Sequence, residues 1–154
     1  MPTPSPLSAA QTRALEASLG VVRDQRRRVR EEGAPLDPVQ AWSTPFGLGY
    51  LLGVVDGMCQ AHGAAFDAHG LAMYGLVLDD TFGRPRSDAL RRLAVRHLQA
   101  GHADLARGRQ WGGNEAIGQT RGLAVAVGLV LLARGDEGRM GGPVGRVGPA
   151  GGLA

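Results

Sequence analysis

The stretch from Thr44 to His62, TPFGLGYLLGVVDGMCQAH, constrains the fold more than any other part of the sequence. Thr44 can accept hydrogen bonds from the free N–H groups of a first helical turn, and Pro45 suits the first helical position, where a missing donor is harmless. Apolar residues then follow at spacings of three and four and also occupy other directions around the helix. Because a helix that is apolar on nearly all sides belongs in a protein interior, we expect this one to be central.

Glycines recur at every fourth position of this predicted central helix, at Gly49, Gly53 and Gly57. Each glycine costs about 1 kcal/mol relative to alanine in a helix interior. That cost is explained if a second backbone approaches closely along the glycine stripe. Gly118 and Gly122 also lie four apart, in the last predicted helix. The sequence therefore predicts that these two helices cross closely in the middle of the fold.

Asp56 lies beside Gly53 and Gly57, so the predicted crossing would withdraw its carboxylate from water. A buried carboxylate needs a partner of opposite charge. Arg121 lies beside Gly122 on the helix expected to cross, and we therefore predict a buried ion pair between Asp56 and Arg121. Removal of one member of such a pair costs about 3–5 kcal/mol.

The hydrophobic periodicity along the chain predicts an all-α, single-domain helical bundle with disordered termini. The Ser8–Gln11 capping box starts the first helix, Gly33 stops it, and Asp37-Pro38 opens a short helical turn. The Trp111-Gly112-Gly113 sequence indicates a later break. We expect five principal helices near residues 8–32, 45–62, 68–82, 88–110 and 114–134, preceded by a flexible arm at 1–7 and followed by a Gly/Pro-rich tail at 135–154.

The apolar run from Gly122 to Ala133 is twelve residues long, whereas a membrane span needs about 20. We therefore expect a buried helix there and no membrane span. The N-terminus lacks the basic region and apolar run of a secretory signal, which favours a cytoplasmic protein. The single Cys59 lies in the apolar central helix, where a buried, unreactive thiol is expected.

Basic residues are all arginines: the chain holds 17 arginines and no lysine, with a net charge of +3. The basic cluster near the end of the first helix is interspersed with acids, so one interpretation is a solvated helix end. The alternative is a nucleic-acid-binding surface made by Arg23, Arg26, Arg27, Arg28 and Arg30.

Asp79 and Asp80 lie in the last turn of a predicted helix, where the helix dipole disfavours negative charge. We expect ion pairs with nearby arginines such as Arg84, Arg86, Arg91 and Arg92. The alternative is a site for a divalent metal or a partner.

Metal-binding and catalytic motifs are weak in this sequence. His62 and His97 are candidate ligands, but no Glu-x-x-His pair of the kind used in di-iron bundles occurs. His97 falls on the apolar stripe of its helix, where a core histidine is the simpler interpretation. No Gly-x-Ser-x-Gly elbow and no Walker lysine occurs, so no catalytic residue and no cofactor is indicated.

Three functions are compatible with these patterns. The first is a non-enzymatic accessory or assembly protein that acts through protein–protein contacts, as a homo-oligomer or with another protein. This hypothesis depends on the absence of a catalytic constellation and on a heptad-like seam from Leu15 to Val29. The second is a metal-binding or small-ligand-binding helical protein. The third is nucleic-acid binding through the arginine-rich end of the first helix.

Overall fold

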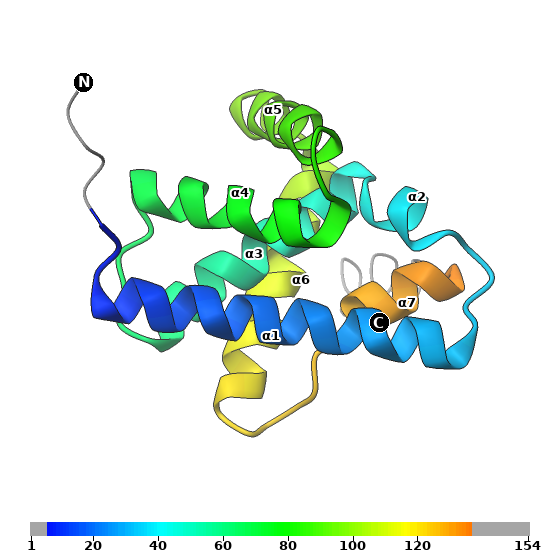
Figure 1. Cartoon of the computed structure of the whole chain (residues 1–154), viewed down its shortest axis with the longest axis horizontal. Coiled ribbons are helices and arrows are strands. Elements are labelled where there is room, and N and C mark those ends of the chain that lie inside the picture. Colours follow the sequence, from blue (N-terminus) through cyan, green and yellow to red (C-terminus); the bar gives the residue numbers. More distant parts are fainter. Residues whose placement is uncertain (1–5, 137–154) are drawn as a thin grey trace, which may run out of the picture.

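The computed structural model describes residues 6–136, and this part of the chain is all-helical, without a strand (Figure 1). It contains seven helices rather than the five expected: α1 (Ala9–Glu32), α2 (Pro38–Trp42), α3 (Pro45–Ala61), α4 (Ala68–Phe82), α5 (Arg86–Gln99), α6 (Ala103–Thr120) and α7 (Gly128–Arg134). The predicted arm at 1–7 and tail at 135–154 lie almost entirely outside the described residues. None of the helices described here is long and apolar enough to cross a membrane.

Local capping signals set the starts of several helices where the sequence predicts them. The Ser8 side chain accepts from the N–H of Gln11 at 3.0 Å while the Gln11 side chain accepts from the N–H of Ser8, which completes the capping box of α1. Thr44 accepts from the N–H of Gly47 at 3.1 Å, and Pro45 is the first residue of α3. Gly33 ends α1 in the left-handed conformation, with φ of 64°. These ends are fixed by residues within one turn of the cap.

The helix expected at 88–110 is two helices, and the expected break at Trp111-Gly112-Gly113 does not occur. The chain turns at Gly101, whose φ is 67°, and α6 then runs without interruption from Ala103 through Trp111 to Thr120. Gly112 is used for packing against α3 instead of for a turn. The two consecutive glycines predicted a turn, but the chain stays helical there because both glycines pack against α3.

The helix expected at 114–134 is also divided. Its first part belongs to α6, Gly122 has a positive φ of 71°, and α7 begins only at Gly128. The first N–H groups of α7 find partners on other helices: Gly128 donates to Glu115 Oε1 at 2.9 Å and Leu129 donates to Gln25 Oε1 at 2.8 Å. This helix start depends on side chains distant in sequence, which is why no local cap marks it.

The predicted central helix, α3, does lie in the middle of the fold. Only Asp56, Gln60, Pro45 and Ala61 among its residues are not buried. Figure 1 shows α1 and α4 side by side across the front of the view, with α3 and α6 crossing behind them, α5 at the top and α2 with α7 at the right. The apolar seam of α1 packs into this core, because Val22 and Val29 are buried and Leu15 and Leu19 are partly buried against it.

Candidate ligand-binding site

The contact between α3 and α6 is a close crossing of two glycine-bearing backbones. A methyl group at Gly49 would overlap the carbonyl oxygen of Leu105, and one at Gly53 would overlap that of Arg109. On α6, methyl groups at Gly108 and Gly112 would overlap the carbonyl oxygens of Phe46 and Tyr50 in the same way. Gly57 of α3 lies against Gly113 of α6. The glycines of α3 therefore lie in direct contact with the backbone of α6.

The glycines expected to form the other half of the crossing do not do so. A methyl group at Gly118 would have no atom within 4 Å, and the same is true of Gly122, which lies in the turn after α6. The glycines that face α3 are instead Gly108, Gly112 and Gly113. The error follows from the misplaced break at Trp111-Gly112-Gly113, which assigned the contact glycines to a turn.

Asp56 pairs with Arg109 and not with Arg121. Arg109 donates to Asp56 Oδ2 from both Nε and Nη2, at 3.3 and 3.1 Å. Because Gly53 faces Arg109 and Gly113 across the crossing, the residue of α6 next to Asp56 is Arg109. Arg121 lies exposed at the C-terminal cap of α6. The pair is also less enclosed than predicted, since the two side chains are 24% and 31% exposed.

A pocket of about 360 Å³ opens beside this ion pair, between α3, α5 and α6. Asp56 and Arg109 contribute its charges. Uncharged polar groups and apolar side chains complete the lining, which includes Gln60, Gln110, Asn114, His97, His102, Leu98, Leu105, Ala106 and Ile117. The Arg109 guanidinium is held from another side as well, because it lies 5.4 Å from the centre of the Phe66 ring. Fixed polar groups beside an apolar wall are the usual composition of a small-molecule site.

Two histidines meet at the α5–α6 side of the pocket. The rings of His97 and His102 are in edge-to-face contact, with centroids 4.6 Å apart. His102 also caps α6, because its Nδ1 accepts from the N–H of Asp104 at 3.2 Å. His97 was expected on the apolar stripe of its helix and instead lines the pocket, half-buried.

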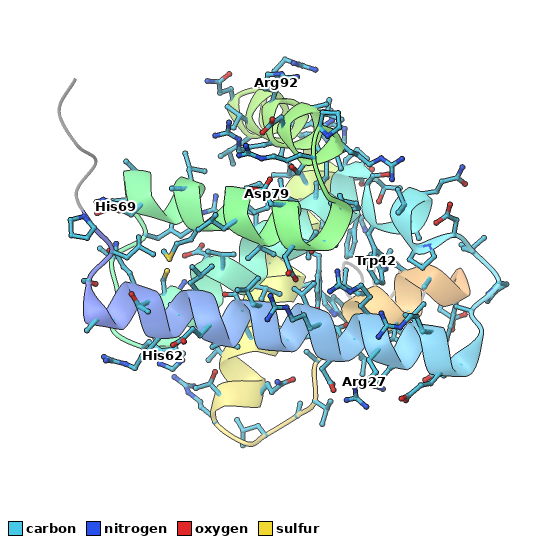
Figure 2. The ribbon with its side chains drawn as sticks, in the orientation of Figure 1. Arg27, Trp42, His62, His69, Asp79 and Arg92 are labelled. Atoms are coloured by element: carbon cyan, nitrogen blue, oxygen red, sulfur yellow. The ribbon has the colours of Figure 1, made fainter. Side chains whose placement is uncertain are left out.

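The two candidate metal ligands, His62 and His97, are not brought together. His62 ends α3 and does not line the pocket. Figure 2 shows it at the opposite side of the molecule from α5, the helix that carries His97. Within residues 6–136 no group of three or more His, Cys, Asp or Glu side chains is arranged to hold a metal ion.

The arginines near the end of α1 are largely engaged within the protein. Arg23 pairs with Asp80 at 2.7 Å, and Arg26 donates to the Asp80 carbonyl oxygen at 2.8 Å. Arg27 pairs with Asp24, and Arg28 donates to the carbonyl oxygen of Ala126 at 3.3 Å. Of the five proposed nucleic-acid contacts, Arg30 alone has no such partner among residues 6–136, so this cluster mainly connects α1 to its neighbours.

Asp79 and Asp80 are both compensated, as expected, but only partly by the arginines proposed. The hydrogen bonds from Arg23 of α1 lower the pKa of Asp80. The Ser87 hydroxyl lowers the pKa of Asp79 most, followed by Arg84. These contacts leave no reason to place a divalent metal here.

A buried polar network around Tyr50 has no counterpart in the sequence predictions. The Tyr50 hydroxyl donates to Glu115 Oε1 at 2.5 Å and accepts from Gln25 Nε2 at 2.9 Å. Burial, followed by the nearby Glu115, raises the pKa of Tyr50 well above its ordinary value. Gln25 was detectable as a polar residue between the buried Val22 and Val29 of α1. Its side-chain oxygen accepts a hydrogen bond from the N–H of Leu129, in the first turn of α7.

Cys59 is buried, as the sequence predicts. Burial, with smaller contributions from Asp56 and Asp67, raises the pKa of its thiol to about 11. At neutral pH the thiol is therefore protonated and unsuited to nucleophilic chemistry.

The fold and the pocket define an all-helical protein with a polar-and-apolar cavity beside a fixed ion pair. No protein-family model matches the chain, and neither curated proteins nor solved structures gave a match.

Proposed function

We propose that this chain is a non-enzymatic helical protein that binds a small molecule in the pocket between α3, α5 and α6. The observation that carries the proposal is the juxtaposition of the fixed Asp56–Arg109 pair with an apolar wall formed by Leu98, Leu105 and Ile117. Of the hypotheses drawn from the sequence, the small-ligand one receives the most support from the geometry.

The lining indicates an uncharged polar ligand with an apolar face. The one carboxylate and the one guanidinium of the pocket neutralise each other, so a ligand charge would gain little net attraction. The amides of Gln60, Gln110 and Asn114 can each donate and accept hydrogen bonds. A volume of about 360 Å³ is at the small end of ligand pockets. These properties suit a heterocyclic compound better than a metabolite rich in phosphates.

The test is a thermal-shift screen of uncharged heterocycles, followed by calorimetry on any hit. A ligand at about 100 times its Kd stabilises the folded state by about 2.7 kcal/mol. The substitution Ala106→Trp fills the pocket from an exposed position on α6, and Ala103→Trp is the matched control on the same helix outside the pocket. We expect A106W to abolish the shift and A103W to retain it. A library without a hit, or a hit that A106W binds equally well, contradicts the proposal.

A second candidate function is assembly through protein–protein contacts. It is favoured by the exposed apolar side chains of the loop between α6 and α7, where Leu123 is 77% and Val125 is 62% exposed. The seam of α1 no longer favours this function, because it packs on the protein's own core.

Light scattering and native mass spectrometry test the second candidate. We expect an oligomer, or a co-purifying protein, that is lost in the Leu123→Ser/Val125→Ser variant. Leu76→Ser removes another exposed apolar side chain, 48% exposed on α4, and is expected to leave the assembly unchanged. A strict monomer without a bound protein contradicts this candidate.

A further inference from the structure

Helix α5 carries four arginines and one acidic residue, and it lies on the outside of the fold (Figure 1). Arg86, Arg91, Arg92 and Arg96 are all exposed. Figure 2 shows Arg92 projecting away from the rest of the molecule. Ser87 and Ala94 are buried on the inner side of the helix and Arg91 lies between them, beside Gly75 of α4, so the other three arginines occupy the outer surface.

These arginines differ from most others among the described residues because they have few internal partners. Ion pairs engage the arginines of α1, α6 and α7 that face acids, namely Arg23, Arg26, Arg27, Arg107, Arg109 and Arg134. Within residues 6–136, Arg86, Arg92 and Arg96 make neither an ion pair nor a side-chain hydrogen bond. The Arg91 side chain lies over Gly75 of α4, and its charge helps to lower the pKa of Asp79. The positive charge of α5 is therefore mostly uncompensated.

The spacing of these charges suits an extended anion. Arg92 and Arg96 are four residues apart and share the outward face of α5, about 6 Å apart along the axis. Arg86 flanks that face, whereas Arg91 lies on the inner side towards Gly75 of α4. The distance along the axis from Arg86 to Arg96 is about 15 Å. Three guanidinium groups spread along a helix cannot converge on one phosphate, but they can contact successive phosphates of a chain.

We propose that the outward face of α5 binds the phosphodiester backbone of a nucleic acid. This surface is separate from the cluster at the end of α1 and does not depend on the small-ligand pocket. A membrane is the less suitable polyanion, because a helix that binds a lipid surface inserts large apolar side chains next to its basic ones. Five large apolar side chains are exposed in the described part of the chain, and none of them is on α5.

The experiment measures the binding of short fluorescein-labelled duplex DNA, single-stranded DNA and single-stranded RNA by anisotropy, at salt concentrations from about 50 to about 200 mM. Three phosphate contacts on duplex DNA predict that this increase in salt weakens binding about 40-fold. The Arg92→Gln/Arg96→Gln variant leaves one contact, so its affinity should fall only about threefold over the same range. Comparison of the three probes shows whether the surface prefers a duplex or a single strand, and whether it prefers DNA or RNA.

The matched control is Arg13→Gln/Arg30→Gln, which removes the same charge from two exposed arginines of α1. We expect it to keep the wild-type salt dependence. Circular dichroism establishes that both variants remain helical. The proposal is overturned if none of the three nucleic-acid probes binds at low salt, or if the two double variants lose affinity equally. It is also overturned if the protein binds phosphatidylserine vesicles and none of the nucleic-acid probes.

Discussion

Tyr50 shows how a single side chain can join helices that are distant in sequence. Its hydroxyl connects Gln25 of α1 to Glu115 of α6, and those two side chains accept the first N–H groups of α7. Its ring also lies against Gly128, where an added methyl group would overlap it. A fully satisfied buried network of this kind specifies one arrangement of its helices, since any shift leaves polar groups without partners.

At the residue scale, the first prediction concerns the Asp56–Arg109 pair. Because both side chains are partly exposed, solvent screens their attraction, and the coupling free energy should be about 1 kcal/mol. This is well below the 3–5 kcal/mol expected for loss of one member of a fully buried pair. A double-mutant cycle with Asp56→Asn and Arg109→Gln, followed by urea denaturation, measures the coupling.

The control for this cycle replaces Arg109→Gln with Arg121→Gln. Arg121 lies exposed at the cap of α6, so we expect its coupling to Asp56 to be near zero. Equal coupling in the two cycles would show that the charge of Asp56 acts through the general field and not through the observed pair.

At the element scale, alanine substitutions distinguish the glycines of α3 and α6 that lie in close backbone contact from those that face open space. Gly53→Ala places a methyl group against the Arg109 carbonyl oxygen, and neither backbone can move without disturbing the core. We expect a loss of about 3 kcal/mol or more in the free energy of unfolding. Gly118→Ala adds a methyl group in open space within a helix, so we expect a gain of about 0.5–1 kcal/mol.

Chemical denaturation of the two variants measures both effects under the same conditions. The two substitutions have the same chemistry and both lie inside helices, which makes them a matched pair. A Gly118→Ala variant destabilised as strongly as Gly53→Ala would favour the crossing first expected from the sequence, and a neutral Gly53→Ala would contradict the close contact of α3 with α6.

Helix starts and ends were predictable where their signals are local. The capping box of α1 and the Thr44-Pro45 start of α3 depend on residues within one turn. The end of α5 at Gln99, the turn at Gly101 and the start of α7 were not predicted. A glycine is ambiguous in sequence, since the residue that permits a turn at Gly101 also permits the close contact at Gly112. Only the packed fold distinguishes the two uses.

At the scale of the whole molecule, the helical fold and the central place of α3 followed from hydrophobic patterning. The site was only partly predictable. Asp56 and the α3 glycines were recognised because a charge and small residues are unusual in a buried helix. The opposing residue Arg109 was missed, because the register between two helices depends on contacts and not on spacing within either sequence. The pocket, formed by three helices, left no signal in any single segment.

The buried thiol and phenols predict a loss of stability in alkali. Burial raises the pKa of Cys59 from 9.0 to about 11 and raises the pKa values of Tyr50 and Tyr74 above their ordinary 10.0. Above about pH 9 the unfolded chain releases protons that the folded protein keeps. The free energy of unfolding should therefore hold up to about pH 9 and fall progressively through pH 11 as these groups ionise in the unfolded state.

Urea denaturation as a function of pH measures this fall. In the Cys59→Ala variant the remaining buried groups are phenols, so the onset should move from about pH 9 to about pH 10. An unchanged onset in that variant, or constant stability up to pH 11, would contradict the burial of these groups.

The crossing of α3 on α6 positions both the core and the pocket, and one measurement tests it most directly. Gly53 lies in contact with Arg109 and Gly113 across the crossing. In an NMR spectrum of the labelled protein we therefore predict nuclear Overhauser effects between the backbone protons of Gly53 and those of Arg109 and Gly113. Overhauser effects from Gly53 to Gly118 or Gly122 in their place, or none to α6, would contradict it.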